Sequence, residues 1–396
     1  MIKSYIITTT EIDDGAEAVR EVTEKLASLA LLKNTVGIVI AHPEFVTSGV
    51  YAQVAGAFPF PITGKTTISH CAGGAVDTYM LSVMALTSDD CAFSCGLSES
   101  IPHNGDAGDV TRAAYGDTLG RLEGEPKVAF LYAPFYRDPY LGGCLEAMSE
   151  AAGSSVPIFG AAANDDQTGL PNREIQARVL YNDEAYSDKF ALMLISGAVD
   201  PKFYMVSATE ESMVMPRVGV ITKAANSRLL EINNVSAADF LRGMGFPVDE
   251  PSNNSGLLSS IFVLHINDGN GGVNVSRIPH GLTDNGGILC GGDVMEGALL
   301  SIAFNTRDVV LETAKIAADR VTVQHNSGTV IAHSCLGRRY GLLSEPQAEL
   351  ELLKNSLGGD FNAIVSYASG EICPTVVCGG RADNRFHNQT LVACAF

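Results

Sequence analysis

The feature that most constrains the fold of this sequence is its many short apolar segments, which alternate only irregularly with amphipathic helical ones. Segments such as 36–41 and 190–196 have the length and apolar composition of buried β-strands. Several such segments follow one another without a helix between them, so the strict alternation of a doubly wound parallel sheet is not expected. The sequence therefore predicts an α+β fold of mixed β-sheets covered by helices. Periodic apolar residues place these helices at 14–32, 109–122, 141–152, 307–319 and 345–356.

The order of the predicted elements partly restarts after Pro216. This restart predicts two α+β domains, residues 1–215 and 216–396. Within the first domain, the strand-like segments 79–87 and 91–96 are joined by a short Ser-Asp-Asp turn, which predicts a β-hairpin. No short-period repeat or low-complexity tract is visible in the sequence.

The charge of the chain excludes several classes of partner. Its 45 acidic and 26 basic residues give a net charge of −19, and no Lys/Arg cluster interrupts this excess. Such a chain repels the phosphates of nucleic acids and the surface of anionic membranes. Its longest apolar stretches, such as 190–199, are about half as long as a membrane-spanning helix. We therefore expect neither nucleic acid nor membrane as a partner.

Cysteine content and the amino-terminal segment indicate the compartment. The segment 1–15 has one lysine and a short apolar run that soon reaches acidic residues, unlike a signal peptide. Nine cysteines are scattered without regular spacing, an odd number that does not suit a disulfide framework. The sequence predicts a cytoplasmic protein whose cysteines are all reduced.

Three local motifs suggest chemistry that their surroundings do not support. Residues 61–67 end like a phosphate-binding loop, but the first glycine is replaced by Pro59, and prolines remove amide donors. The glycine-rich stretches 268–272 and 285–292 suit turns better than a dinucleotide site, because neither opens a helix. No CxxC or HExxH pattern is present, so no metal site is expected.

Cysteine and histidine also stand side by side in the chain, in the pairs His70-Cys71 and His333-Ser334-Cys335. A nucleophile formed by Cys335 and a histidine stays open, because such groups meet in space rather than in sequence. A small buried thiol is the favoured interpretation of Cys335.

Polar residues at the ends of the carboxy-terminal strands give the candidate site. Arg338 closes one apolar strand, Glu371 follows Ser369-Gly370 at the end of another, and His387 and Asn388 precede the last strand. Arginine donates two parallel hydrogen bonds to a carboxylate, and a glutamate can face an ammonium group. We therefore predict that Arg338, Glu371, His387 and Asn388 bind a small zwitterion. The alternative is structural, with Arg338 and Glu371 paired to each other and Asn388 holding the last strand.

These segments also resemble a known family. Residues 333–338 (HSCLGR), 369–372 (SGEI) and 386–391 (FHNQTL) are similar to the closing motifs of FIST proteins, named for F-box and intracellular signal transduction. In the amino half, 61–69 (PITGKTTIS) and 156–166 (VPIFGAAANDD) resemble the corresponding strand entries, so the likeness spans nearly the whole chain. Lys65 departs from the family pattern, which often has a small residue or cysteine there.

The resemblance implies a FIST N-terminal domain followed by a FIST C-terminal domain in a cytoplasmic sensory protein. Such a protein binds a small ligand, with amino acids proposed, and controls a signalling output. Because two FIST domains fill the sequence, the output is expected from a separate partner, such as a histidine kinase or a chemoreceptor.

Three functions therefore remain open. The first is a ligand-binding signalling protein without catalysis of its own. The second is a haem-based nitric-oxide sensor, as some family members are, with haem as the cofactor, although no CxxCH motif is present. The third is a cysteine-dependent enzyme that uses Cys335.

Overall fold

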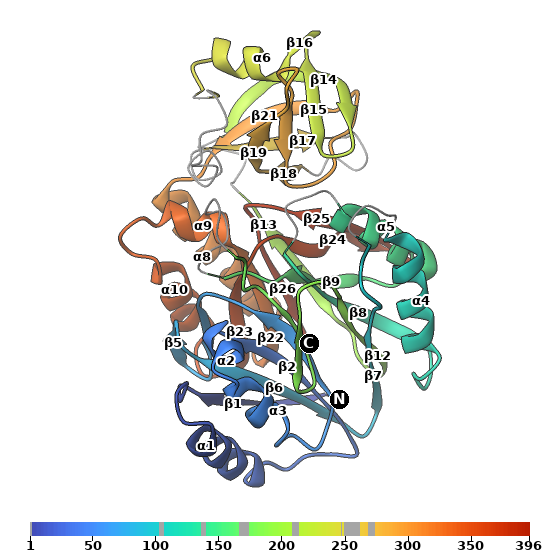
Figure 1. Cartoon of the computed structure of the whole chain (residues 1–396), viewed down its shortest axis with the longest axis vertical. Helices are drawn as coiled ribbons and strands as arrows, with labels where there is room; N and C mark the ends of the chain where they lie inside the picture. The colour runs from blue at the N-terminus through green and yellow to red at the C-terminus, as the bar shows by residue number, and fades with distance from the viewer. Residues whose placement is uncertain are drawn as a thin grey trace.

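The computed structural model describes residues 2–102, 107–135, 140–165, 174–207, 214–246, 248, 262–267 and 274–396. In these ranges the chain forms a large body of three mixed six-stranded sheets and a smaller β-rich lobe (Figure 1). Helices cover the outer faces of the sheets in the body. The α+β fold with mixed sheets covered by helices is therefore confirmed.

The body is built from three consecutive units with one common order of elements. The first unit contains β1 (Lys3–Thr9), α1 (Gly15–Ala27), β2 (Asn34–Ala41), α2 (Glu44–Thr47), α3 (Val50–Ala55), β3 (Ile62–Thr66), β4 (His70–Ala72), β5 (Ala75–Asp77) and β6 (Leu81–Ser88). The second unit contains β7 (Cys91–Leu97), α4 (Gly108–Leu119), β8 (Pro126–Ala133), α5 (Tyr140–Ala151), β9 (Ile158–Ala162), β10 (Val179–Tyr181), β11 (Glu184–Tyr186) and β12 (Ala191–Gly197).

The third unit repeats this order around an insertion. It contains β13 (Lys202–Val206), α8 (Arg307–Gln324), β22 (Gly328–Cys335), α9 (Leu336–Gly341), α10 (Ala348–Leu357), β23 (Phe361–Ala368), β24 (Glu371–Cys378), β25 (Arg381–His387) and β26 (Leu391–Ala395). The inserted lobe contains β14 (Val214–Ala225), β15 (Arg228–Ile232), β16 (Val235–Ser236), α6 (Ala237–Gly243), β17 (Phe262–Asn267), β18 (Val275–Arg277), β19 (Pro279–Leu282), β20 (Ile288–Cys290) and β21 (Leu299–Phe304).

The three sheets of the body share one strand order and exchange their hairpins. The orders are β1-β6-β2-β3-β10-β11, β7-β12-β8-β9-β24-β25 and β13-β26-β22-β23-β4-β5. In each sheet the third and fourth strands are parallel and all other neighbours are antiparallel. The last two strands of every sheet are a hairpin from another unit. The body is therefore a threefold internal repeat whose units are interlocked.

One predicted hairpin is wrong. The strands at 79–87 and 91–96 form as β6 and β7, but they lie in different sheets and do not pair. The Ser88 hydroxyl accepts hydrogen bonds from the N–H groups of Asp90 and Cys91, which turns the chain from one sheet to the next. The turn residues were recognised, but sequence alone does not distinguish a hairpin from a crossing between sheets.

The predicted boundary near residue 215 lies within β14, at the entrance to the lobe. Strands from both sides of this point share two of the sheets, since β9 pairs with β24 and β4 pairs with β23. The chain returns from the lobe to the body at α8. The division of the chain into 1–215 and 216–396 stays a prediction.

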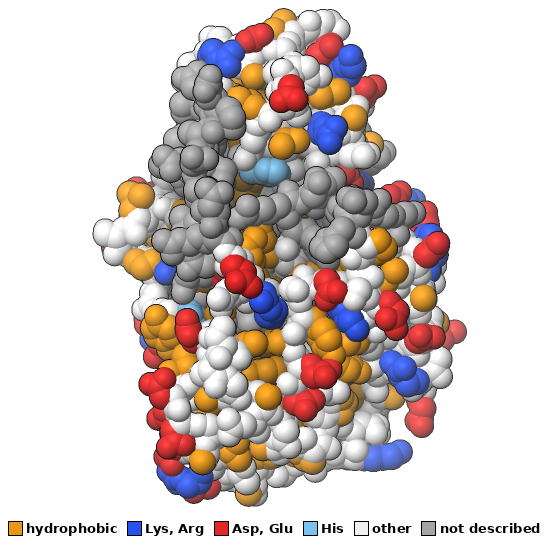
Figure 2. Space-filling view, in the orientation of Figure 1, with side chains coloured by type: hydrophobic (Ala, Val, Ile, Leu, Met, Phe, Trp, Pro, Cys, Tyr) orange, Lys and Arg blue, Asp and Glu red, His pale blue; other side chains and the backbone are white. Residues whose placement is uncertain are grey.

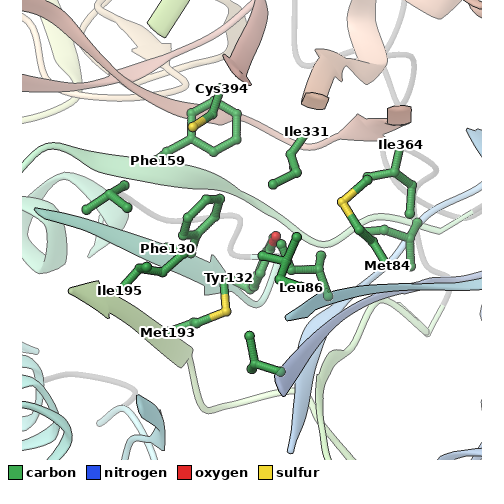
Figure 3. Packing of buried hydrophobic residues seen from close by; sticks show 14 of the residues in the cluster. Met84, Leu86, Phe130, Tyr132, Phe159, Met193, Ile195, Ile331, Ile364 and Cys394 are labelled. Atoms are coloured by element: carbon green, nitrogen blue, oxygen red, sulfur yellow. The ribbon is translucent and has the colours of Figure 1, made fainter. Parts of the chain in front are cut away.

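The buried side chains of the body form one central core and three outer clusters. The inner faces of the sheets enclose one central core, to which Met84, Phe130, Ile331 and Cys394 contribute from all three sheets (Figure 3). Three outer clusters lie between each sheet and its own helices: α1 to α3, α4 and α5, or α8 and α10. Central strands such as β2, β8 and β12 therefore bury both faces, which explains their nearly continuous apolar sequences.

Local sequence signals fix the ends of several helices. The Asp14 side chain accepts hydrogen bonds from the N–H groups of Ala16 and Glu17 at the start of α1, and Ser236 and Thr306 cap α6 and α8 in the same way. Such caps satisfy amide groups that have no partner inside the helix. No described helix combines the length and the hydrophobicity that crossing a membrane requires.

The distribution of charged side chains on the surface agrees with the excess of acidic residues in the sequence. On the face drawn in Figure 2, Lys and Arg side chains stand singly among Asp and Glu. All nine cysteines are free thiols, and only Cys378 is exposed.

A close approach of backbones at Gly64 gives a test of the fold. A Cβ atom at this position would lie 1.7 Å from the carbonyl oxygen of Val39, on the parallel partner strand. We expect Gly64→Ala to lower the free energy of unfolding by more than ~3 kcal/mol in urea denaturation, because backbone cannot move aside cheaply. The control Gly116→Ala, in α4 with open space around it, should leave stability unchanged or slightly higher.

Candidate functional site

Strand pairing brings nine residues of the three units into one layer at the inner ends of the sheets. Lys65 lies between Ile40 and Val179. Neighbours in register share a face of the sheet, and here that face is the central core. We call these nine residues the axial layer: Ile40, Lys65 and Val179; Tyr132, Ala161 and Glu371; His333, Ser366 and His70.

Lys65 is the cation of the axial layer. Its side chain is wholly buried, and its Nζ donates a hydrogen bond to the carbonyl oxygen of Tyr367 at 2.5 Å. Burial lowers the pKa of Lys65 to about 7, and the nearby carboxylate of Glu371 opposes this shift. The amine is therefore close to its point of half-protonation at neutral pH.

Glu371 is the acid of the layer and is also wholly buried. Burial raises the pKa of Glu371 well above its ordinary value, while the Cys335 thiol, the Thr390 N–H, Arg338 and Lys65 oppose the shift. Neither carboxylate oxygen accepts a hydrogen bond of ordinary geometry from the described residues. The layer thus holds an acid and a base whose charged forms are both disfavoured by burial.

The remaining polar groups of the layer are neutral and only partly satisfied. The Nε2 atom of His70 lies 2.8 Å from Ser82 Oγ, and Nδ1 of His333 lies 3.0 Å from Ser366 Oγ. Burial, followed by the charge of Lys65, lowers the pKa of His70 to about 3 and that of His333 well below its ordinary value. Within the described part of the chain, the second ring nitrogen of each histidine and the Tyr132 hydroxyl have no partner.

A ring of three strand ends adjoins the layer. The segments that follow β3, β9 and β23 are joined by hydrogen bonds from Asn164 N to Thr66 O and from Ser369 N to Ala162 O, each 3.2 Å long. A third bond runs from Ile68 N to Asn164 Oδ1 at 2.9 Å. Asn164 Nδ2 and Ser369 Oγ find no acceptor or donor among the residues described. Buried polar atoms are nearly always satisfied, so this concentration of exceptions makes the axial layer and the ring of strand ends the candidate functional site.

Arg338 takes part in a buried ion pair with Glu349. Its guanidinium is buried and donates to Glu349 Oε1 at 2.6 and 2.9 Å, to Ser334 Oγ at 3.1 Å and to Val310 O at 3.0 Å. These bonds join α8, α9, α10 and β22. Arg338 influences Glu371 through the longer range of its charge only. The structural alternative of a pair between Arg338 and Glu371 is wrong, because the partner is Glu349.

His387 and Asn388 lie beside Glu371, at the contact with the lobe. His387 is the register partner of Glu371, and its Nε2 lies 3.0 Å from Cys373 O. The side chain of Asn388 accepts a hydrogen bond from Ile278 N of the lobe at 3.3 Å. Glu371, His387 and Asn388 are thus neighbours, and Arg338 acts on Glu371 only through its charge. A ligand pocket formed by these four residues stays a prediction.

The structure adds Lys65, His70 and His333 to the residues that the strand ends predicted. Each is a charged or imidazole side chain within an otherwise apolar or small-residue strand, which is the signal that could have indicated them. Their common location could not be predicted, because it depends on hairpin exchange between units. Two motifs noted in the sequence, 61–67 and 333–335, therefore meet in one layer.

The state of Cys335 and the arrangement of potential metal ligands disfavour two other kinds of site, a cysteine nucleophile and a metal centre. Burial and the neighbouring Glu371 raise the pKa of the Cys335 thiol well above its ordinary value, which disfavours the nucleophilic thiolate. Among the described residues, no three His, Cys, Asp or Glu side chains are grouped to hold a metal ion.

The described histidines also do not fit an axial haem ligand. Five of the seven are buried in packed strands or at their ends, and the other two, His280 and His325, contact Cys290 O and Tyr204 OH through Nε2. None of these seven described histidines is therefore placed to bind haem iron.

The sequence matches the FIST N domain over residues 35–235 and the FIST C domain over residues 237–374. The chain therefore belongs to the FIST family, whose domains are associated with sensing in signal transduction and with binding of small ligands. Among curated proteins, none matches this sequence.

Two solved structures are similar over the whole chain at low identity. Cyanuric acid hydrolase from A. caulinodans is 9% identical, with 100% of this chain and 99% of that chain covered and a TM-score of 0.33. PurLQS from Thermotoga maritima is 12% identical, with 100% and 72% covered and a TM-score of 0.20. These scores are too low to support an argument about this protein.

The environment of Arg338 predicts a structural effect of its removal. Arg338→Met leaves the buried Glu349 carboxylate without its cation, so the free energy of unfolding should fall by about 3–5 kcal/mol. Combining it with Glu349→Gln should restore much of this loss. The control Arg307→Met breaks the exposed pair with Glu345 and should cost less than about 1 kcal/mol. An Arg338→Met protein of unchanged stability would show that the ion pair is not needed.

Lys65 predicts an unusual dependence of stability on pH. Between pH 7 and 10.5 the unfolded chain binds a proton that the folded protein does not, so Lys65 makes stability rise with pH in this window. Lys65→Met should therefore raise the free energy of unfolding, most strongly below pH 7, and its advantage should shrink toward pH 10.5. Urea denaturation at pH 6, 8 and 10 measures this difference. An advantage that does not change with pH would contradict the assignment.

Proposed function

We propose that this protein is a sensory protein of signal transduction that binds a small zwitterion, such as an amino acid, at the axial layer. The observation that carries the proposal is the presence of Lys65 and Glu371 in one buried layer in which several polar atoms lack partners among the described residues. In the prediction from the sequence, Arg338 binds the carboxylate of the ligand and Glu371 binds its ammonium group. We propose that Lys65 takes this place, because the guanidinium of Arg338 is already bound to Glu349.

The charges favour a zwitterion over other small ligands. A carboxylate beside the Lys65 amine and an ammonium beside Glu371 would each gain a partner of opposite charge, which offsets the desolvation of all four groups. A ligand of only one charge would leave one of the two protein groups uncompensated. Such a mismatch is costly in a buried site.

Neutral groups around the layer support the same ligand class. Asn164 Nδ2 and Ser369 Oγ are unsatisfied donors in the ring of strand ends within the described chain, and they suit carboxylate oxygens. Tyr132 OH and the free ring nitrogens of His70 and His333 can donate or accept as the ligand requires. We place His387 and Asn388 next to the site, where His387 faces Glu371 in register.

The signalling role follows the family. We propose a cytoplasmic location and an output through a separate protein, such as a histidine kinase or a chemoreceptor. An enzyme that uses Cys335 is disfavoured by the raised pKa of its thiol.

The proposal predicts which ligands raise the melting temperature. In a thermal-shift screen over the common amino acids, at least one should add roughly 2.7 kcal/mol of stability at a hundred times its Kd. Lys65→Met and Glu371→Gln should each abolish this shift while the protein stays folded. The matched control Lys127→Met changes an exposed lysine of β8 and should keep the full response.

Different results would favour other functions. A response that survives Lys65→Met and Glu371→Gln would place the ligand elsewhere. A Soret band in the purified protein would favour the haem alternative over the zwitterion.

A further inference from the structure

The strand that carries Glu371 is paired with the strand that holds the lobe. In β24 and β25, Glu371 faces His387 and Ile372 faces Phe386 across the antiparallel ladder. The next residue, Asn388, bonds to Ile278 of the lobe. A change at the carboxylate therefore lies one strand away from the lobe contact.

The ring of Phe386 is wedged between the body and the lobe. On the body side it packs against Gly370, where a Cβ atom would lie only 2.1 Å from Phe386 Cζ. On the lobe side it packs against Gly292, where a Cβ atom would lie 3.1 Å from Phe386 Cδ1. Gly370 stands between Ser369 of the ring of strand ends and Glu371 of the axial layer. Only glycine leaves room for the Phe386 ring at position 370, so Gly370 and Phe386 are in close contact.

The backbone around Phe386 is bonded to the lobe as well. Arg277 of β18 donates from Nη1 to Phe386 O at 2.9 Å and from Nε to Asp293 O at 2.8 Å. Asn388 fills the space beside Gly291, where a Cβ atom would lie 2.8 Å from its Oδ1. Two segments of the lobe, 277–278 and 291–292, thus contact residues 386–388.

We propose that the lobe reports the state of the axial layer, and that Phe386 is the residue that couples the two. This inference rests on the proposed function for its biological meaning, since it makes the lobe the element that changes when a ligand binds. The axial layer is buried on all sides, so a ligand enters only if a neighbouring element shifts. The pair β24–β25 is the neighbour that contains both Glu371 and the lobe contact. Movement of this pair would be transmitted to β18 through Phe386, Arg277 and Asn388.

A double-mutant cycle tests the coupling without any ligand. Glu371→Gln alters the layer at constant shape, and hydrogen exchange of β18 to β20 reports the lobe. In the otherwise natural chain we expect Glu371→Gln to change these exchange rates roughly fivefold or more, the range of typical coupling between sites. In a Phe386→Ala background this change should disappear, and Phe386→Leu should restore part of it. The control Val235→Ala, at an exposed position of the lobe, should leave the response to Glu371→Gln intact.

A second variant keeps the test valid if Phe386→Ala does not fold. Gly291→Ala pushes the side chain of Asn388 from its seat and should also remove the response, whereas Gly243→Ala in α6 has open space and should not. The proposal would be overturned if Glu371→Gln did not change the exchange rates in β18 to β20, or if it changed them equally with and without Phe386. If no amino acid raises the melting temperature of the unmutated protein while the cycle gives the expected result, the zwitterion site is refuted and the coupling stands.

Discussion

The exchange of hairpins between units is the constraint on which the rest of this structure depends. Each sheet ends in a hairpin that another unit supplies, so no unit can complete its own hydrogen bonds. The exchanged hairpins deliver Val179, Glu371 and His70 to equivalent register positions of the three sheets. The axial layer is complete only because β10, β24 and β4 each join the sheet of another unit. The polar character of the site and the stability of the body therefore have the same origin.

The three units use one architecture for unequal chemistry. At equivalent positions the first unit places a lysine, the second an alanine and the third a serine, and the hairpins add a valine, a glutamate and a histidine. Opposite charges thus stand on different units around one core. An arrangement of this kind can distinguish the two ends of a ligand although its backbone is nearly symmetric. The cost is a pair of buried charges that lower the stability of the empty protein.

Much of the fold could be predicted from the sequence, because strands with two buried faces have a continuous apolar pattern. The segments 36–41, 190–196 and 329–334 are recognisable for this reason, and Asp14 marks a helix start through its short acceptor side chain. The exchange of hairpins could not be predicted, since β4, β5, β10 and β11 are three-residue strands without a periodic signal. Glu371 was recognisable at the end of a strand. Lys65 is recognisable as a charge in an apolar strand, but its role could not be predicted, because its neighbours resemble an incomplete phosphate-binding loop and its partner Tyr367 is some 300 residues away.

The interlocked units also determine when this protein can fold during its synthesis. The first sheet needs β10 and β11, so it stays incomplete until about residue 186 has left the ribosome. The second sheet waits for β25, and the third for β26 at the end of the chain. Until β23 is made, β4 presents an unpaired strand edge, and such edges favour association with other chains. The body can therefore close only after β26 has been made, and until then its open strand edges stay available to other chains.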